Sequence, residues 1–205
     1  ENLKKLKDLI NTHGIDCEII NHDKSEHKEK IAAENNQETF GNLSSLLKCF
    51  EVAKKDQSDL IYFVEDDYLH YEHSLVDMLN TYERVSSQHK DEIIVCPSDY
   101  PFNYMNNEKT NILIGSQQHW RTITKMLCTF MISKKMFQKH IDNFEKTCEK
   151  RHEPFEKYLN KILESEIGIS PIKSLAIHMT NVNSSYGLSP FIDIKKLWEE
   201  NKIGQ

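Results

Sequence analysis

The stretch DLIYFVEDD, residues 59–67, decides the expected fold. A run of apolar and aromatic residues, LIYFV, leads directly into three carboxylates, Glu65, Asp66 and Asp67. A short continuous apolar run bounded by polar residues is typical of a strand buried on both faces of a helix-covered sheet. Ligands bind such sheets at the carboxyl ends of the strands. The three acids therefore stand where a binding site is expected.

Further apolar segments surround this strand. Apolar residues at helical spacing along residues 43–53 predict an amphipathic helix introduced by Asn42, and residues 92–101 read as a second buried strand. Residues 111–121, 124–133 and 172–180 add strands of a mixed sheet. We predict an α/β fold with a mixed, mainly parallel central sheet flanked by helices on both faces.

Composition limits the classes of function. A chain of 205 residues favours a single domain over 1–205, and a net charge of -6 argues against a nucleic-acid partner. The five cysteines are widely spaced without a CxxC pair, which indicates reduced thiols and a cytoplasmic protein, free or at the membrane surface. Without an apolar run near ~20 residues, no transmembrane segment is expected.

Three adjacent carboxylates repel one another unless a cation lies among them. Oxygen ligands beside a substrate phosphate suit Mg²⁺ or Mn²⁺. His178 ends the strand expected at 172–180 and would bring an imidazole to the same rim of the sheet. Two simpler interpretations stay open: the acids are solvated loop residues or a helix cap, and His178 is a structural histidine.

Residues 41–69, GNLSSLLKCFEVAKKDQSDLIYFVEDDYL, resemble GT-A fold, nucleotide-sugar-dependent glycosyltransferases of the family 2 type. In those enzymes a small helix bearing an Asn leads to an apolar strand that ends in a DxD-type motif. The resemblance implies that Asp67 binds a divalent metal, Mn²⁺ or Mg²⁺, with His178 completing the coordination. It assigns Glu65 and Asp66 to the nucleotide-sugar donor; most members have Asp rather than Glu at the first position.

The same resemblance divides the chain into a nucleotide-sugar-binding half, about 1–100, and an acceptor-binding half, about 101–205. It places Asn42 with the donor site, which would take a UDP-sugar or GDP-sugar. It also implies that a first strand precedes Glu1 and that residues 16–23 form the second strand, with Asp23 near the nucleotide base. Asp23 can equally end a strand in a turn.

Sugar transfer with inversion needs one base that takes a proton from the acceptor hydroxyl. Asp99, at the end of a strand, and Glu153, before a leucine-spaced helix, are the candidates. Gln118, His119, Trp120 and Arg121 supply an aromatic face with amide and guanidinium donors and are expected to bind a glycan or lipid-linked acceptor. The alternative is that Trp120 belongs to the core and Arg121 to the surface.

Two other functions fit the same pattern. A sugar-nucleotide nucleotidyltransferase also uses a doubly wound sheet and metal-bound acids, but it should show a Gly-rich phosphate loop. A non-catalytic carbohydrate-binding α/β module would need the acids without a base. The expected function is therefore a metal-dependent glycosyltransferase, with these two as alternatives.

Overall fold

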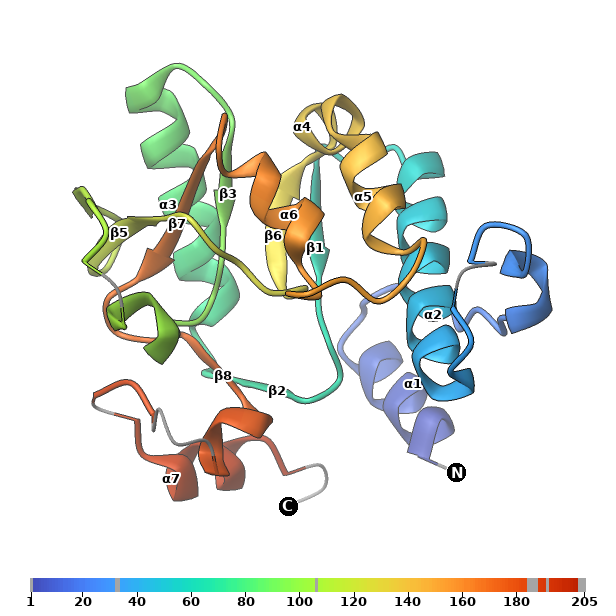
Figure 1. Cartoon of the computed structure of the whole chain (residues 1–205). Helices are drawn as coiled ribbons and strands as arrows, with labels where there is room; N and C mark the ends of the chain where they lie inside the picture. Colours follow the sequence, from blue (N-terminus) through green and yellow to red (C-terminus); the bar gives the residue numbers. More distant parts are fainter. Residues whose placement is uncertain (1, 32–33, 106, 184–187, 191, 203–205) are drawn as a thin grey trace.

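The computed structural model describes residues 2–31, 34–105, 107–183, 188–190 and 192–202 (Figure 1). Within those ranges, no helix is long and apolar enough to cross a membrane. The helices are α1 (Asn2–Thr12), η1 (Lys24–His27), α2 (Gln37–Lys55), α3 (Ser74–His89), η2 (Pro101–Tyr104), α4 (Lys134–Lys139), α5 (Ile141–Thr147), α6 (Lys157–Ile162), η3 (Met179–Asn183) and α7 (Ile194–Glu200). The strands are β1 (Leu60–Phe63), β2 (Tyr68–His70), β3 (Ile93–Val95), β4 (Ile112–Ile114), β5 (His119–Ile123), β6 (Phe130–Ser133), β7 (Ile167–Pro171) and β8 (Ala176–His178).

The strands form a six-stranded sheet in the order β1-β6-β3-β7-β5-β4 and a separate two-stranded sheet of β2 and β8. The predicted α/β class is confirmed. The expectation of a mainly parallel sheet is wrong. Among the described residues, only the neighbours β3 and β7 pair in parallel, and the other neighbouring strands of the large sheet pair antiparallel. Parallel neighbours need a crossover connection, and the chain instead runs from β4 through β5 to β6 without an intervening helix.

Two apolar cores cover the two faces of the large sheet. Successive side chains of a strand point to opposite faces, so Phe63 and Ile94 face one core while Tyr62 and Ile93 face the other. Helices α2, α4, α5 and α6 pack on the first face, and α3 packs on the second. Figure 1 shows this layered arrangement, which confirms the prediction of helices on both faces.

Helix α2 begins earlier than the sequence suggested. The side chain of Asn36 accepts a hydrogen bond of 2.9 Å from the backbone N–H of Thr39, which makes Asn36 the N-cap in place of Asn42. Asn42 consequently lies inside the helix with an exposed side chain. Asn42 lines the cleft described below.

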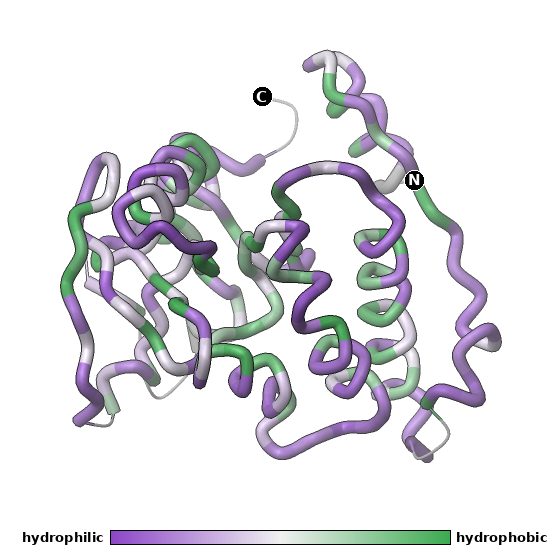
Figure 2. Tube along the Cα trace, turned by 90° about the horizontal axis from the view of Figure 1, so that it is seen from above, coloured by the Kyte–Doolittle hydropathy of each residue, from purple (hydrophilic) through white to green (hydrophobic). Residues whose placement is uncertain are grey.

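Helix α1 and the segment that follows it lie outside the sheet (Figure 1), and Figure 2 shows the trace that follows the N-terminus running along one side of the molecule. Helix α1 is followed by Gly14, which has a φ of 70°, a conformation that favours glycine. The strand expected at 16–23 is not formed. Among the described residues no strand pairs with that segment, and its Ile19 and Ile20 are 38% and 42% exposed. A β-strand needs such a partner to satisfy its backbone hydrogen bonds.

Candidate functional site

The three acids occupy the connection between β1 and β2. Burial and the neighbouring carboxylate of Asp67 raise the pKa of Glu65 to about 7, whereas Asp66 is exposed. Glu65 is therefore harder to ionise than a carboxylate in water, mainly because it is buried and to a smaller extent because other carboxylates lie nearby. A bound cation would act against the second of these effects.

The small sheet brings His178 to this connection. Strands β2 and β8 are antiparallel, with Tyr68 directly opposite His178. His178 Nε2 lies 2.7 Å from Asp67 Oδ2, across 111 residues of sequence, and the ring of His178 stacks on Tyr68 with centroids 4.8 Å apart. The Asp67 side chain is 40% exposed, so it can still accept a ligand. The structure therefore brings together the two predicted metal ligands.

A cleft of about 570 Å³ opens beside the acids. One wall is α2, which contributes Thr39, Asn42 and Ser45, and the other includes Arg151 and Phe155 from the segment before α6. Glu65, Asp66 and Asp67 lie between these walls. Four of the predicted donor and metal residues thus line one cleft: Asn42, Glu65, Asp66 and Asp67.

Glu156 is an acid that the sequence interpretation missed. It is half-buried at the start of α6, and burial raises its pKa, with His178 acting against this and Glu153 adding to it. Glu156 also contributes to the raised pKa of Glu65. Glu153, the candidate from the sequence, is exposed, and neither Glu153 nor Glu156 is among the residues that line the cleft. The available signal was the spacing of two acids in EPFE, residues 153–156, at a helix start.

Asp99, the second predicted base, lies in a buried ion pair. Its carboxylate accepts hydrogen bonds from Arg121 at 3.0 Å, from Tyr104 at 2.7 Å and from Ser189 at 2.5 Å. Burial raises the pKa of Asp99, and these three partners act against that rise. The Arg121 guanidinium also lies 4.1 Å above the centre of the Tyr104 ring. Asp99 and Arg121 are thus paired with each other and stabilise this part of the fold. This pairing does not favour Asp99 as the residue that transfers a proton or Arg121 as a residue that binds the acceptor.

The remaining predicted acceptor residues are His119 and Trp120 in β5 and Gln118 just before it. Trp120 is fully buried in the core beneath α3, and His119 is exposed. Gln118 donates to buried Asp77 at 3.1 Å and accepts from the backbone of Lys173 at 3.0 Å. Strand β5 is four places from β1 in the sheet order, or roughly 19 Å at the usual strand spacing. These side chains therefore do not converge with the acids on one cleft.

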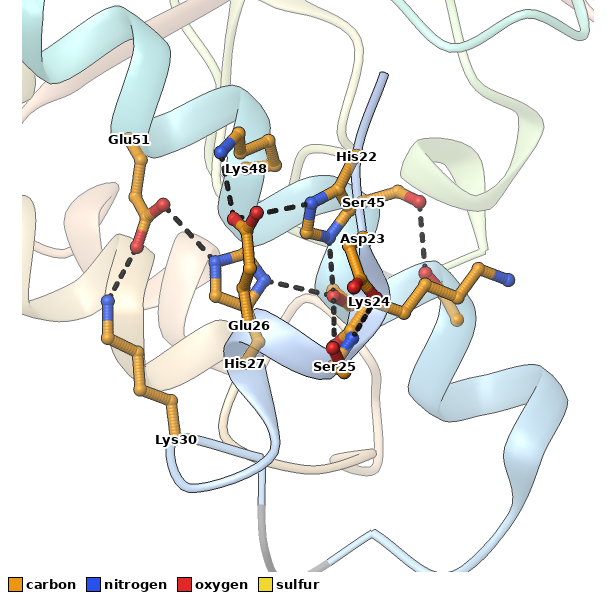
Figure 3. Close-up of polar contacts among 12 residues, drawn as sticks. His22, Asp23, Lys24, Ser25, Glu26, His27, Lys30, Ser45, Lys48 and Glu51 are labelled. Atoms are coloured by element: carbon orange, nitrogen blue, oxygen red, sulfur yellow. Dashed lines mark hydrogen bonds and ion pairs between the residues drawn. The ribbon is translucent and has the colours of Figure 1, made fainter. Parts of the chain in front are cut away.

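Asp23, the predicted contact to the base, lies in a polar cluster that fastens residues 22–30 to α2 (Figure 3). Its carboxylate accepts a 2.9 Å hydrogen bond from the backbone of Ser25 and caps η1. Nearby, His27 lies 2.9 Å from Ser44 Oγ and 3.2 Å from Glu51. Asp23 thus ends a turn locally, as the simpler interpretation of this residue allowed, and it is exposed outside the cleft.

No family model matches the chain, and no curated protein matches it. The assignment of function therefore depends on the geometry of the cleft.

Proposed function

We propose that this chain is a metal-dependent glycosyltransferase that moves a sugar from a nucleotide-diphosphate donor to a hydroxyl of a glycan or lipid-linked acceptor. The contact between Asp67 and His178 at an open, acid-lined cleft carries the proposal. Asp67, just before β2, and His178, at the end of β8, are far apart in the sequence, yet their carboxylate and imidazole lie next to each other. Such a pair is more specific for a metal ion than the acidic triplet alone.

The donor set fits a divalent cation in its chemistry. Asp67 and His178 would hold the ion, and Mn²⁺ accepts both carboxylate and imidazole ligands. Among the described residues, no three His, Cys, Asp or Glu side chains converge closely enough to hold a metal ion by themselves. Donor phosphate oxygens and water would therefore complete the coordination. When bound, the ion would neutralise the charge that grows on the departing diphosphate.

The protein's own residues have the following roles. Glu65 and Asp66 contact the donor, and Asn42 approaches it from α2. Glu156 replaces Glu153 as the proposed base, because its half-buried carboxylate has a raised pKa and lies near His178. A carboxylate with a raised pKa accepts a proton from the acceptor hydroxyl more readily than an exposed one.

Calorimetry with Mn²⁺ and either UDP or GDP tests the proposal. We expect the wild type to bind one of the two nucleotides only in the presence of Mn²⁺, and Asp67→Asn to bind it at least about tenfold more weakly. Asp59→Asn is the matched control, because Asp59 is an exposed acid at the other end of the same strand. Absence of nucleotide binding by the wild type, or full binding by Asp67→Asn, contradicts the proposal.

A second assay separates a transferase from a binding module. We expect the wild type with Mn²⁺ to hydrolyse the matching nucleotide-sugar slowly when no acceptor is present, and Glu156→Gln to lose that activity while it still binds the nucleotide. A non-catalytic module would bind and release the nucleotide-sugar unchanged.

A further inference from the structure

We infer that Thr129 is a positioning residue that fixes the orientation of Glu65 in the cleft and thereby the affinity for the metal-bound donor. This inference rests on the proposed function. Thr129 lies outside the sequence stretch that carries the acids and does not itself line the cleft.

The pairing of β1 with β6 determines where Thr129 lies. Phe63, the last residue of β1, is directly opposite Phe130, the first residue of β6, in this antiparallel pair. Thr129, which precedes β6, therefore lies beside the residues that follow β1. Thr129 is fully buried. Its Oγ1 accepts a 3.0 Å hydrogen bond from the backbone N–H of Glu65 and donates a 3.3 Å hydrogen bond to Glu65 Oε2. A single hydroxyl thus restrains both the backbone and the carboxylate of Glu65.

The restraint on the Glu65 carboxylate comes from one side chain. Among the described contacts, the Thr129 hydroxyl is the side-chain group that hydrogen-bonds the Glu65 carboxylate. Without this hydroxyl, the Glu65 side chain would be free to rotate away from Asp67. Valine has nearly the same shape as threonine but cannot form either bond.

Thr129 also lies next to the other half of the site. The Tyr68 hydroxyl interacts with the side chains of Tyr100 and Thr129. The ring of Tyr68 in turn stacks on His178. Thr129 therefore neighbours both the acid connection and the strand pair that delivers the histidine.

The test compares Thr129→Val, which removes the hydroxyl, with Thr129→Ser, which keeps it. Thr147→Val is the control, since Thr147 is equally buried and its hydroxyl bonds only a carbonyl of its own helix, that of Asn143 at 2.9 Å. Calorimetry measures binding of UDP and GDP with Mn²⁺. Hydrogen exchange resolved by NMR measures protection of the Glu65 amide, which does not depend on nucleotide binding.

We expect Thr129→Val to bind the nucleotide about tenfold more weakly, the effect of losing one hydrogen bond to a charged group. We also expect its Glu65 amide to exchange faster. Thr129→Ser and the control should behave as the wild type in both measurements. Wild-type affinity in Thr129→Val overturns the inference and leaves the proposed function intact, as does an equal loss in Thr129→Ser. A wild type that binds no metal–nucleotide complex overturns both.

Discussion

Replacing Glu65 with Gln should stabilise the protein, and the gain should depend on pH. Burial and Asp67 raise the pKa of Glu65 from the ordinary 4.5 to about 7. The folded state therefore holds a proton that the unfolded state has lost at any pH between these values. Because the folded state binds more protons, stability falls as the pH rises through this window, and the loss is complete above about pH 7. Glu65→Gln has no carboxylate to ionise and escapes this loss.

The size of the gain follows from the same shift. About 1.4 kcal/mol for each pKa unit gives a penalty of about 3 kcal/mol at pH 8 and less than about 1 kcal/mol at pH 5. Glu65 is only half-buried, and solvent screens part of its repulsion. We therefore expect a gain of about 2 kcal/mol in the free energy of unfolding at pH 8.

Urea unfolding followed by circular dichroism, without divalent cations, measures this gain at about pH 5 and about pH 8. The control is Asp66→Asn, which removes the exposed neighbouring carboxylate and should change stability less. Glu65→Gln less stable than the wild type at pH 8 would refute the reasoning. An equal gain at both pH values would also refute it, because a gain independent of pH cannot arise from ionisation of Glu65.

Three further substitutions test contacts that stabilise the fold. Partial burial raises the pKa of Glu51, but hydrogen bonds from a lysine and a histidine outweigh it and lower this pKa to about 2. The resulting stabilisation is present above pH 4.5 and is lost as the pH falls toward 2. Glu51→Gln should therefore lower the free energy of unfolding by about 1–2 kcal/mol at pH 7, and by less near pH 3, in urea unfolding. Lys134 Nζ donates to three carbonyls at the end of α2, at 2.6, 3.0 and 2.5 Å, and Lys134→Met should lower the unfolding free energy by about 1–2 kcal/mol, whereas exposed Lys135→Met should not. A Cβ at Gly115 would lie 2.2 Å from Trp120 Cδ1, so Gly115→Ala should cost about 2 kcal/mol or more, measured by thermal unfolding.

The catalytic candidates show where reasoning from the sequence was limited. Glu153 is a candidate because it precedes a helix, but a position in the chain does not specify which of two nearby acids turns inward. The start of α6 leaves Glu153 exposed and half-buries Glu156 instead. Likewise, Trp120 and Arg121 matched the residue types of a sugar site, although packing beneath α3 and an ion pair with Asp99 account for them.

The sequence by itself determined the features that depend on neighbouring residues. Alternation and apolar runs along the strands predicted an α/β fold with helices on both faces, and the acids after LIYFV marked the end of the strand that borders the cleft. These patterns are local, because side chains alternate with a period of two along a strand and about 3.6 along a helix.

Tertiary structure alone decided which distant residues meet. The sheet order places β6 antiparallel between β1 and β3, which brings Thr129 to Glu65, and the β2–β8 pair places His178 2.7 Å from Asp67. Strand order and register depend on how whole strands and helices pack against one another, a choice that the local pattern of any one segment does not encode. The acids could therefore be found from the sequence, but their partners could be identified only in the folded chain.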